Sequence, residues 1–537
     1  MTQEGPGAVR RLRCRGANHW LTAALLVLPL LLGIAVFDDY GLGWDESPQR
    51  VLGRQAWRYV FQGDPTYLQN YNLPYGVAFE LVLTGAEKLA PPGDTRPAFL
   101  VRHLLTFAVF WAASLCLFAL TRWLLRSTAA GVAAAAGLFL SPRLFADAFV
   151  NSKDLPFLSF FVVAAWTLAL YLRRPTHPRA VLHGAACACA TDIRVVGLLL
   201  PALTLLALLA AWPGGPLRRR LATLLSFAAA TAAFTVLLWP YLWNDPWHRL
   251  VAAFTRMAHY PWGGEVLFLG QFIHSSQAPW YYLPVWIGVT TPLSLLLAGV
   301  LGLAVTVRTS LSDEDRSRRA LAVVLLAWLF LPPAAILALH SVLYDGWRQT
   351  YFLAPALVVV AVAGLQACWH AARRPTASPW LRTAAAAGLV GVALDMGATA
   401  AWMVRAHPYQ NVYFNRLAGP RDQLGQRFDL DYWGLSCRRL LESVLARDPR
   451  PSVPVYTPEK VCEWNARLLP RGERDRMQFV GSADGADYVV TIHRWSGDSP
   501  PPGKEIDSVR VDGVRLGAVY LLRPQPSWSA APARGIE

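Results

Sequence analysis

Two short polar motifs interrupt an otherwise apolar sequence, and both contain residue types that could do acid-base or phosphate chemistry. Asp45 and Glu46 stand in "GWDES" after the first apolar run, and Lys153 and Asp154 stand in "FVNSKDLPF" between two later runs. Adjacent side chains point in different directions on a regular backbone, so at most one of the two acids in the first motif should face a given pocket. Such a carboxylate could be a general base, a metal ligand or a solvated loop end.

The second motif precedes a Leu-Pro pair, which favours the start of a helix. Asp154 therefore has two interpretations, a cap for that helix or a member of a polar site. Lys153 has no comparable structural explanation, and it is the only lysine between Lys88 and Lys460. A cation beside the first turn of a helix is suited to bind a phosphate.

Two further cations lie at the ends of other apolar runs, Arg194 in "TDIRVVG" and Arg348 in "LYDGWRQTYF", the latter close to Tyr344. One interpretation is a structural ion pair, Arg194 with Asp192 or Arg348 with Asp345. The other is that the arginines join the lysine of the second motif in holding an anionic group, with a carboxylate nearby to accept a proton.

A third polar cluster, "AHPYQNVYFN", directly follows the last apolar run and contains His407 and Tyr409. These residues could contact a substrate or anchor the following segment at the membrane surface. The eleven histidines of the chain show no HxxxH or comparable pair. We therefore predict no metal site and no cofactor.

The elements that must position these residues are long apolar segments. Hydrophobic residues make up 54% of the 537-residue chain and charged residues only 16%, and the apolar residues form runs long enough to cross a bilayer. The net charge of +15 comes mostly from arginines in the short connections, which is the cytoplasmic-loop bias of membrane proteins rather than a nucleic-acid-binding pattern. The runs cover residues 20–37, 98–121, 128–146, 155–172, 180–212, 221–241, 283–307, 320–340, 351–370 and 382–404.

The run 180–212 cannot be one helix, because both of its ends are rich in arginine and should lie on the same side of the membrane. A single helix would also be about 50 Å long against a hydrocarbon core of about 30 Å. Two shorter helices that meet near "TDIRVVG" remove both conflicts. The sequence thus predicts an α-helical membrane protein with about 11 spans, its N-terminus inside and its C-terminus outside.

This topology divides the chain into four parts. Residues 1–19 form a basic cytoplasmic tail, 20–405 form the membrane domain with a first outer loop at 38–97, 406–522 form an outer soluble domain and 523–537 form a disordered tail. The soluble part is expected to be a small α/β domain, with a helix around 432–446 and strands in "PSVPVY", "ADYVVTIH" and "VRLGAVYLL". Cys437 and Cys462 could form a disulfide there if the domain is extracytoplasmic.

The motifs together resemble a known family. "GWDESPQ" after the first run, "SPRLFADAFVNSKDLPF" after the third, "LYDGWRQTYFLAPAL" before a late span, and "HPYQNVYFN" with "FDLDYWGLS" after the last are similar to bacterial membrane glycosyltransferases of family 39. This family belongs to the GT-C superfamily, alongside protein O-mannosyltransferases and aminoarabinose transferases. The resemblance covers nearly all of the membrane part, and it implies a GT-C fold.

The resemblance also implies a function. It is the transfer of a sugar from a polyprenyl-phosphate carrier to a lipid, glycan or protein acceptor, with inversion at the anomeric carbon, on the outer face of a bacterial cytoplasmic membrane. The catalytic acid of the family lies in an Asp-Glu pair, which maps onto Asp45 as general base with Glu46 beside it. A further acid near the pocket maps onto Asp154, or more weakly onto Asp147.

The remaining site residues follow from the same resemblance and from their level along the spans. The carrier phosphate would bind Lys153, Arg194 and Arg348. Independently of the resemblance, Tyr344 beside Arg348 is a candidate substrate contact, and for His407 and Tyr409 we favour anchoring with some substrate contact. The alternative function is a transporter or flippase for lipid-linked sugars, which would also need a basic and aromatic outer cavity. A transporter would be expected to show internal repeats and polar residues deep in several helices, and the sequence shows neither.

Overall fold

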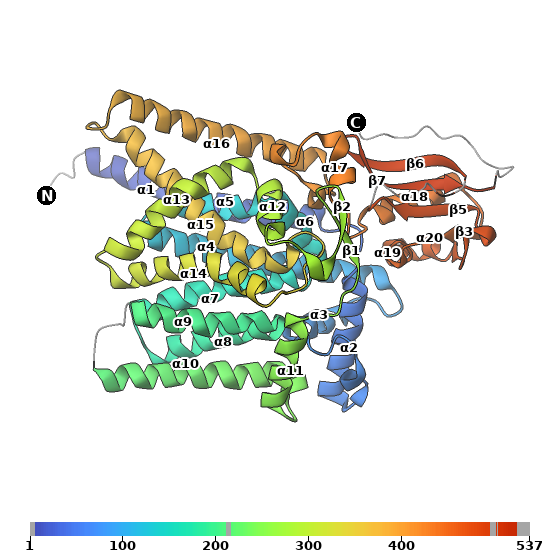
Figure 1. Ribbon diagram of the computed structural model, residues 1–537, viewed down its shortest axis with the longest axis horizontal. Coiled ribbons are helices and arrows are strands. Elements are labelled where there is room, and N and C mark those ends of the chain that lie inside the picture. Colours follow the sequence, from blue (N-terminus) through green and yellow to red (C-terminus); the bar gives the residue numbers. More distant parts are fainter. Residues whose placement is uncertain (1–5, 211–215, 495–500, 502, 524–537) are drawn as a thin grey trace.

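The computed structural model describes residues 6–210, 216–494, 501 and 503–523, most of them helical. In Figure 1 the long helices run side by side across the view, and a smaller domain with a β-sheet lies at one end of them. Helix α1 (Pro6–Val36) begins at the opposite end and already includes most of the basic segment that was expected to precede it as a tail. Residues 524–537 fall outside the described residues, so the disorder of this segment stays a prediction.

Seven helices of the described part are long and apolar enough to cross a membrane, or eight if one bent pair counts as a span. The seven are α4 (Thr95–Leu125), α7 (Asp154–Arg173), α10 (Leu217–Leu238), α13 (Leu293–Ser312), α14 (Arg316–Ala338), η5 with α15 (Arg348–Leu353 and Ala354–Arg373) and α16 (Pro379–Arg405). Shorter apolar helices cover Thr22–Val36 within α1 and Val195–Ala210. The prediction of a polytopic helical membrane protein is confirmed, while the count of eleven spans stays a prediction.

The run 180–212 is broken into two helices, as predicted from its length and its flanks. Helix α8 (His177–Ile193) ends at the predicted point, a 3-10 turn η2 (Val195–Leu198) follows, and α9 (Leu199–Ala210) runs back. The turn is tight at Gly197, where a Cβ atom would lie 2.4 Å from the backbone nitrogen of Thr191. Asp192 does not pair with Arg194 but accepts from the backbone N–H of Ala78 at 2.6 Å.

The segment between the third and fourth runs contains a short helix of its own. Helix α5 (Thr128–Phe139) ends and α6 (Pro142–Val150) begins at an angle of 66°, so the predicted run 128–146 is bent rather than continuous. The bend lies at Ser141-Pro142, where Pro142 occupies the first turn of the new helix. Arg143 on α6 is buried and donates to the backbone carbonyl of Tyr413 at 3.0 Å, which joins this bend to the segment after α16.

The predicted outer segments lie at the same end of the helices as the sheet domain, whereas the arginine-bearing connections α13–α14 and α15–α16 lie at the other end (Figure 1). The first outer loop forms α2 (Glu46–Gln62), η1 (Pro65–Gln69) and α3 (Ala78–Glu87). The segment between α10 and α13 forms η3 (Pro240–Leu242), α11 (Pro246–Ala258), the antiparallel hairpin β1 (Glu265–Phe268) and β2 (Gln271–His274), η4 (Ser275–Gln277) and α12 (Tyr282–Thr290).

The C-terminal domain has one five-stranded sheet in the order β4-β3-β5-β7-β6. Its strands are β3 (Val453–Tyr456), β4 (Met477–Phe479), β5 (Tyr488–Ile492), β6 (Lys504–Val511) and β7 (Val514–Leu521). Strand β3 pairs in parallel with β4 and β5, and β7 pairs antiparallel with β5 and β6. Its helices are α17 (Leu424–Arg427), α18 (Ser436–Arg447), α19 (Lys460–Asn465) and α20 (Arg471–Arg474).

The predicted α/β character of this domain is confirmed, with three strands found where the sequence suggested them. Strands β4 and β6 were missed, the first because it has only three residues and the second because charged residues alternate along it at the sheet edge. Cys437 on α18 and Cys462 on α19 form a disulfide. One continuous buried apolar cluster extends from the membrane helices into the sheet, so the domain is packed firmly against the bundle.

Candidate active site

The two polar motifs meet at the end of the bundle that carries the C-terminal domain. Asp45 immediately precedes α2, but its side chain makes no capping hydrogen bond to that helix. Its carboxylate instead accepts from the Lys153 ammonium at 2.9 Å and from the Arg348 guanidinium at 3.0 Å. The Asp45 side chain is 23% exposed, whereas those of Lys153 and Arg348 are 8% and 4% exposed. A partly open carboxylate therefore faces two buried cations.

Asp154 is the first residue of α7, yet it does not cap the helix. The side-chain oxygen of Asn151 accepts from the backbone N–H groups of Lys153 and Asp154, at 3.2 and 2.8 Å, so the capping interpretation of Asp154 is wrong. Its carboxylate pairs with Arg194 at the α8–α9 turn and with Arg348 at 3.2 Å. This arrangement explains why Arg194 can be held at the turn without Asp192.

Arg348 lies at the centre of the cluster. Besides its contacts with the two polar motifs, it donates to Asp345 at 3.0 and 3.2 Å, so one guanidinium serves three carboxylates. Its planar group also lies over the rings of Tyr344 and Trp433, at 5.1 and 4.9 Å from the centroids. A rigid fork with several donors suits this position better than the single point charge of a lysine would.

The C-terminal domain contributes Arg494 to the cluster, where this arginine contacts Asp345. Arg494, which follows β5, pairs with Asp345 at 2.7 Å and with Asp429 at 3.3 Å. Asp345 and the next residue, Gly346, both have positive φ values, 55° and 71°. Such a backbone is costly outside glycine, and here the two flanking arginines hold the aspartate in place.

The electrostatics leave Asp45 ionised. Burial by itself would raise the pKa of the Asp45 carboxyl, but the charges of Lys153 and Arg348 outweigh burial and hold the pKa well below its ordinary value. The cluster contains three cations, Lys153, Arg194 and Arg348, and three carboxylates, Asp45, Asp154 and Asp345. An anion that entered here would have to share these cations with carboxylates that now hold them.

An apolar cavity of about 370 Å³ opens beside the cations. Arg194, Tyr75 and Tyr344 line its polar end, and aliphatic residues of η2, α9 and α14 such as Leu331 and Ile336 line the rest. Tyr75 also lies under the Lys153 ammonium, 4.6 Å from the ring centroid. The cavity thus combines one cationic end with a lining that is otherwise mostly apolar.

Other predicted site residues lie outside the cluster. Glu46 is 2% exposed, pairs with His103 of α4 at 2.9 Å and accepts from the backbone N–H of Gly43, so it holds the start of α2. Asp147, the weaker choice for the second acid, is fully buried on α6 and accepts from the indole N–H of Trp433 at 3.1 Å. Both acids have structural partners.

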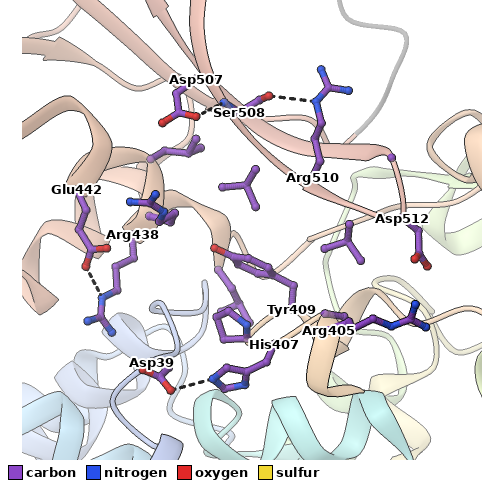
Figure 2. A pocket seen from close by; sticks show the side chains of 18 of the residues that line it. Asp39, Arg405, His407, Tyr409, Arg438, Glu442, Asp507, Ser508, Arg510 and Asp512 are labelled. Atoms are coloured by element: carbon purple, nitrogen blue, oxygen red, sulfur yellow. Dashed lines mark hydrogen bonds and ion pairs between the residues drawn. The ribbon is translucent and has the colours of Figure 1, made fainter. Parts of the chain in front are cut away.

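The structure also separates the residues that were grouped as substrate contacts. Tyr344 lies against Arg348 and lines the apolar cavity. His407 pairs with Asp39 at 2.8 Å, and together with Tyr409 it lines a different pocket beneath the sheet domain, shown in Figure 2. Neither His407 nor Tyr409 is among the residues in contact with Asp45 or Arg348.

Some members of the cluster were not identified as site residues from sequence. Asp345 was considered only as an ion-pair partner, and Trp433 and Tyr75 gave no signal because their roles depend on tertiary contacts. Asn151 was overlooked although its capping contacts are local. Arg494 comes from the far domain and could not be placed from the chain order. Among the described residues, no group of three or more histidines, cysteines or acids is arranged to hold a metal ion.

Comparisons with known proteins identify the fold. No protein-family model matches the sequence, and no curated protein sequence matches it either. Solved structures do match. ArnT from Cupriavidus metallidurans, in the apo state and bound to undecaprenyl phosphate, is 15% and 14% identical, with 95% of this chain and 100% of that chain covered and a TM-score of 0.50 for each.

The apo oligosaccharyltransferase of Archaeoglobus fulgidus is 13% identical, with 88% of this chain and 69% of that chain covered and a TM-score of 0.50. At these identities the likeness shows the fold alone. The chain therefore has the GT-C fold.

Proposed function

We propose that this protein is an inverting glycosyltransferase that moves a sugar from a polyprenyl-phosphate carrier to an acceptor on the outer face of the cytoplasmic membrane. Asp45 is the general base, and Lys153, Arg194 and Arg348 bind the carrier phosphate. The observation that carries the proposal is the junction between the charged cluster and the apolar cavity. A partly exposed carboxylate is held by Lys153 and Arg348. The cavity is lined by Arg194 and by the two tyrosines that lie against those cations, Tyr75 and Tyr344.

The residues divide the work of a single displacement. The acceptor hydroxyl oxygen attacks the anomeric carbon, its proton passes to the Asp45 carboxylate, and the bond from that carbon to the phosphate oxygen breaks. The electron pair of the broken bond leaves with the carrier phosphate, whose growing negative charge the three cations neutralise. The apolar cavity between η2, α9 and α14 would hold the first part of the polyprenyl chain.

The low pKa of Asp45 in the free protein fits this sequence of events. A carboxylate with a very low pKa is a weak base, because two cations stabilise its charge. When the carrier phosphate binds to Lys153 and Arg348, these cations stabilise the charge of Asp45 less, so the basicity of Asp45 rises. The base would therefore become active only after the donor is bound.

The pH dependence should reflect this state of the free protein. Because its pKa is lowered, Asp45 stays ionised on lowering the pH through the range where an ordinary base of pKa near 6 or 7 would become protonated. The profile of kcat/KM, which reports the free enzyme, should thus show no acidic decline from about pH 7 to about pH 5. Steady-state transfer rates across that range test this, and a decline centred near pH 6 would assign the base to another group.

Replacing Lys153 should weaken donor binding more than it slows the chemical step. A charge-assisted contact to phosphate is worth about 1.5–3 kcal/mol, so Lys153→Ala should raise KM for the carrier-linked sugar roughly tenfold or more. Asp45 would keep Arg348 as its partner, so the fold should persist. Lys88→Ala is the matched control, because Lys88 is an exposed lysine of the same outer region that lies over Trp57. An equal KM for native protein and Lys153→Ala would contradict the assignment.

A comparison of detergent micelles with sealed vesicles separates transfer from transport. In micelles there is no second compartment, so a flippase could not consume its substrate, whereas a transferase would still release polyprenyl phosphate when an acceptor is present. We expect release in micelles. Movement of the lipid-linked sugar across vesicles without any release in micelles would favour the transporter.

A further inference from the structure

A second cavity, of about 860 Å³, lies between the end of the last membrane helix and the sheet domain (Figure 2). Its walls come from four places: Asp39 after α1, the end of α16 with the turn that follows it, the first turns of α18, and the hairpin of β6 and β7. None of the residues assigned to the carrier phosphate lines it. A ligand in this cavity would be distinct from the one at Asp45.

The acids of this cavity already have partners within the protein. Asp39 pairs with His407, and each of the other acids pairs with an arginine. These pairs are Glu442 with Arg438 at 2.9 Å, Asp507 with Arg447 at 2.9 Å, Asp512 with Arg421 at 2.9 Å, and Glu505 with Arg515 at 2.5 Å. The carboxylates are therefore largely neutralised by groups within the protein.

Two arginines of the lining remain in excess. Arg405, the last residue of α16, and Arg439 on α18 are exposed, and within the described part of the chain neither forms an ion pair. Arg510 contacts Glu505 only at 3.5 Å, with both side chains well exposed, a geometry that contributes little. The cavity lining thus contains exposed guanidinium groups that have no carboxylate partner among the described residues.

The position of the cavity and its other lining residues narrow the class of ligand that it could bind. Arg405 ends a membrane helix, so the cavity begins at the level where lipid headgroups meet water. The buried rings of Tyr409 and Trp402 and the Ser508 hydroxyl offer stacking and hydrogen-bonding surfaces beside the cations. Guanidinium groups bind phosphate through paired hydrogen bonds, and the volume exceeds what one inorganic ion would fill.

We propose that this cavity is a binding site for a phosphate ester, with Arg405 and Arg439 as its phosphate ligands. The ester is either the headgroup of a membrane lipid or a soluble phosphorylated compound, since both present the same chemistry to the arginines. Binding here does not require the transfer reaction, so it can be measured on the full-length protein without a sugar donor.

Two binding measurements on the purified full-length protein distinguish the sources. Calorimetry with glycerol 3-phosphate reports a soluble ester, and native mass spectrometry in neutral micelles containing phosphatidic acid reports a lipid that carries the same headgroup. We expect binding in at least one of the two measurements. The measurement that detects binding shows whether the ligand is a soluble ester or a lipid headgroup. Absence of binding in both arms would overturn the proposal.

Variants then locate the binding event. The double variant Arg405→Gln with Arg439→Gln should lose one binding event per chain or weaken it roughly tenfold or more. Arg416→Gln is the matched control, because Arg416 is an exposed arginine of the segment that follows α16 and does not line the cavity. The double variant should have the same unfolding temperature as the native protein, since the substitutions break no ion pair. Equal binding by the double variant and the native protein would place the phosphate elsewhere and overturn the proposal.

Discussion

Asp45→Asn should lower the rate of sugar transfer by about 10²- to 10⁴-fold, the usual contribution of a positioned general base, while the protein stays folded. The asparagine side chain has nearly the same shape and can still accept a hydrogen bond from Lys153 or Arg348. Arg348 also keeps its pairs with Asp154 and Asp345. The loss of activity would therefore come from the missing proton transfer and not from a change in the structure.

The same substitution should affect the carrier in the opposite direction. Asp45 and the carrier phosphate compete for Lys153 and Arg348, so removal of the carboxylate charge should leave binding of polyprenyl phosphate unchanged or tighter. Two quantities are measured for each variant: the transfer rate at saturating donor and the Kd for polyprenyl phosphate. Asp64→Asn is the matched control, since Asp64 lies in the same outer loop, pairs with Arg58 and is distant from the cluster. A variant with nearly full transfer would rule out Asp45 as the base.

Arg348→Ala should both abolish transfer and destabilise the protein. Removal of one partner from a buried ion pair leaves the other charge uncompensated and costs about 3–5 kcal/mol. Arg348 is shared by three carboxylates, of which Asp154 is almost fully buried. The unfolding temperature in detergent should fall well below that of the native protein, and carrier-phosphate release should vanish even at temperatures where the variant is folded.

Arg348→Lys separates the two effects. A lysine restores one positive charge but cannot reach the pairs with Asp45 and Asp345 at the same time, because it lacks the planar fork. We expect most of the stability to return while the transfer rate remains low. Arg382→Ala, at an exposed arginine of α16, controls for the loss of an arginine as such. Native-like transfer by Arg348→Lys would show that geometry at this position is unimportant.

The sequence placed most of the cluster because membrane topology is a strong constraint. Lys153, Arg194 and Arg348 are separated by long apolar stretches, yet each stands at the end of a run that must finish at the same surface. Polar residues at such ends face the same water, so counting spans places them at one level of the membrane. The broken run 180–212 shows the same reasoning at work, since its length and flanks required the turn that places Arg194 beside Asp154.

The remaining features of the site depend on tertiary contacts, which cannot be predicted by counting membrane spans. Glu46 and Asp45 are neighbours in sequence, and only the partner of each, His103 for one and Lys153 for the other, decides which faces the pocket. His407 stands at the right level but lies under the sheet domain, because its partner is Asp39. Arg494 reaches the cluster from a domain that sequence analysis could fold only in outline.

The most direct test of the central claim is release of polyprenyl phosphate from a panel of polyprenyl-phosphate sugars. Purified native protein and Asp45→Asn would be incubated with each donor, with and without extracts that supply acceptors. The account predicts release from at least one donor by the native protein when acceptor is present, and little or none by Asp45→Asn. Absence of release from every donor, with or without acceptor, would contradict it.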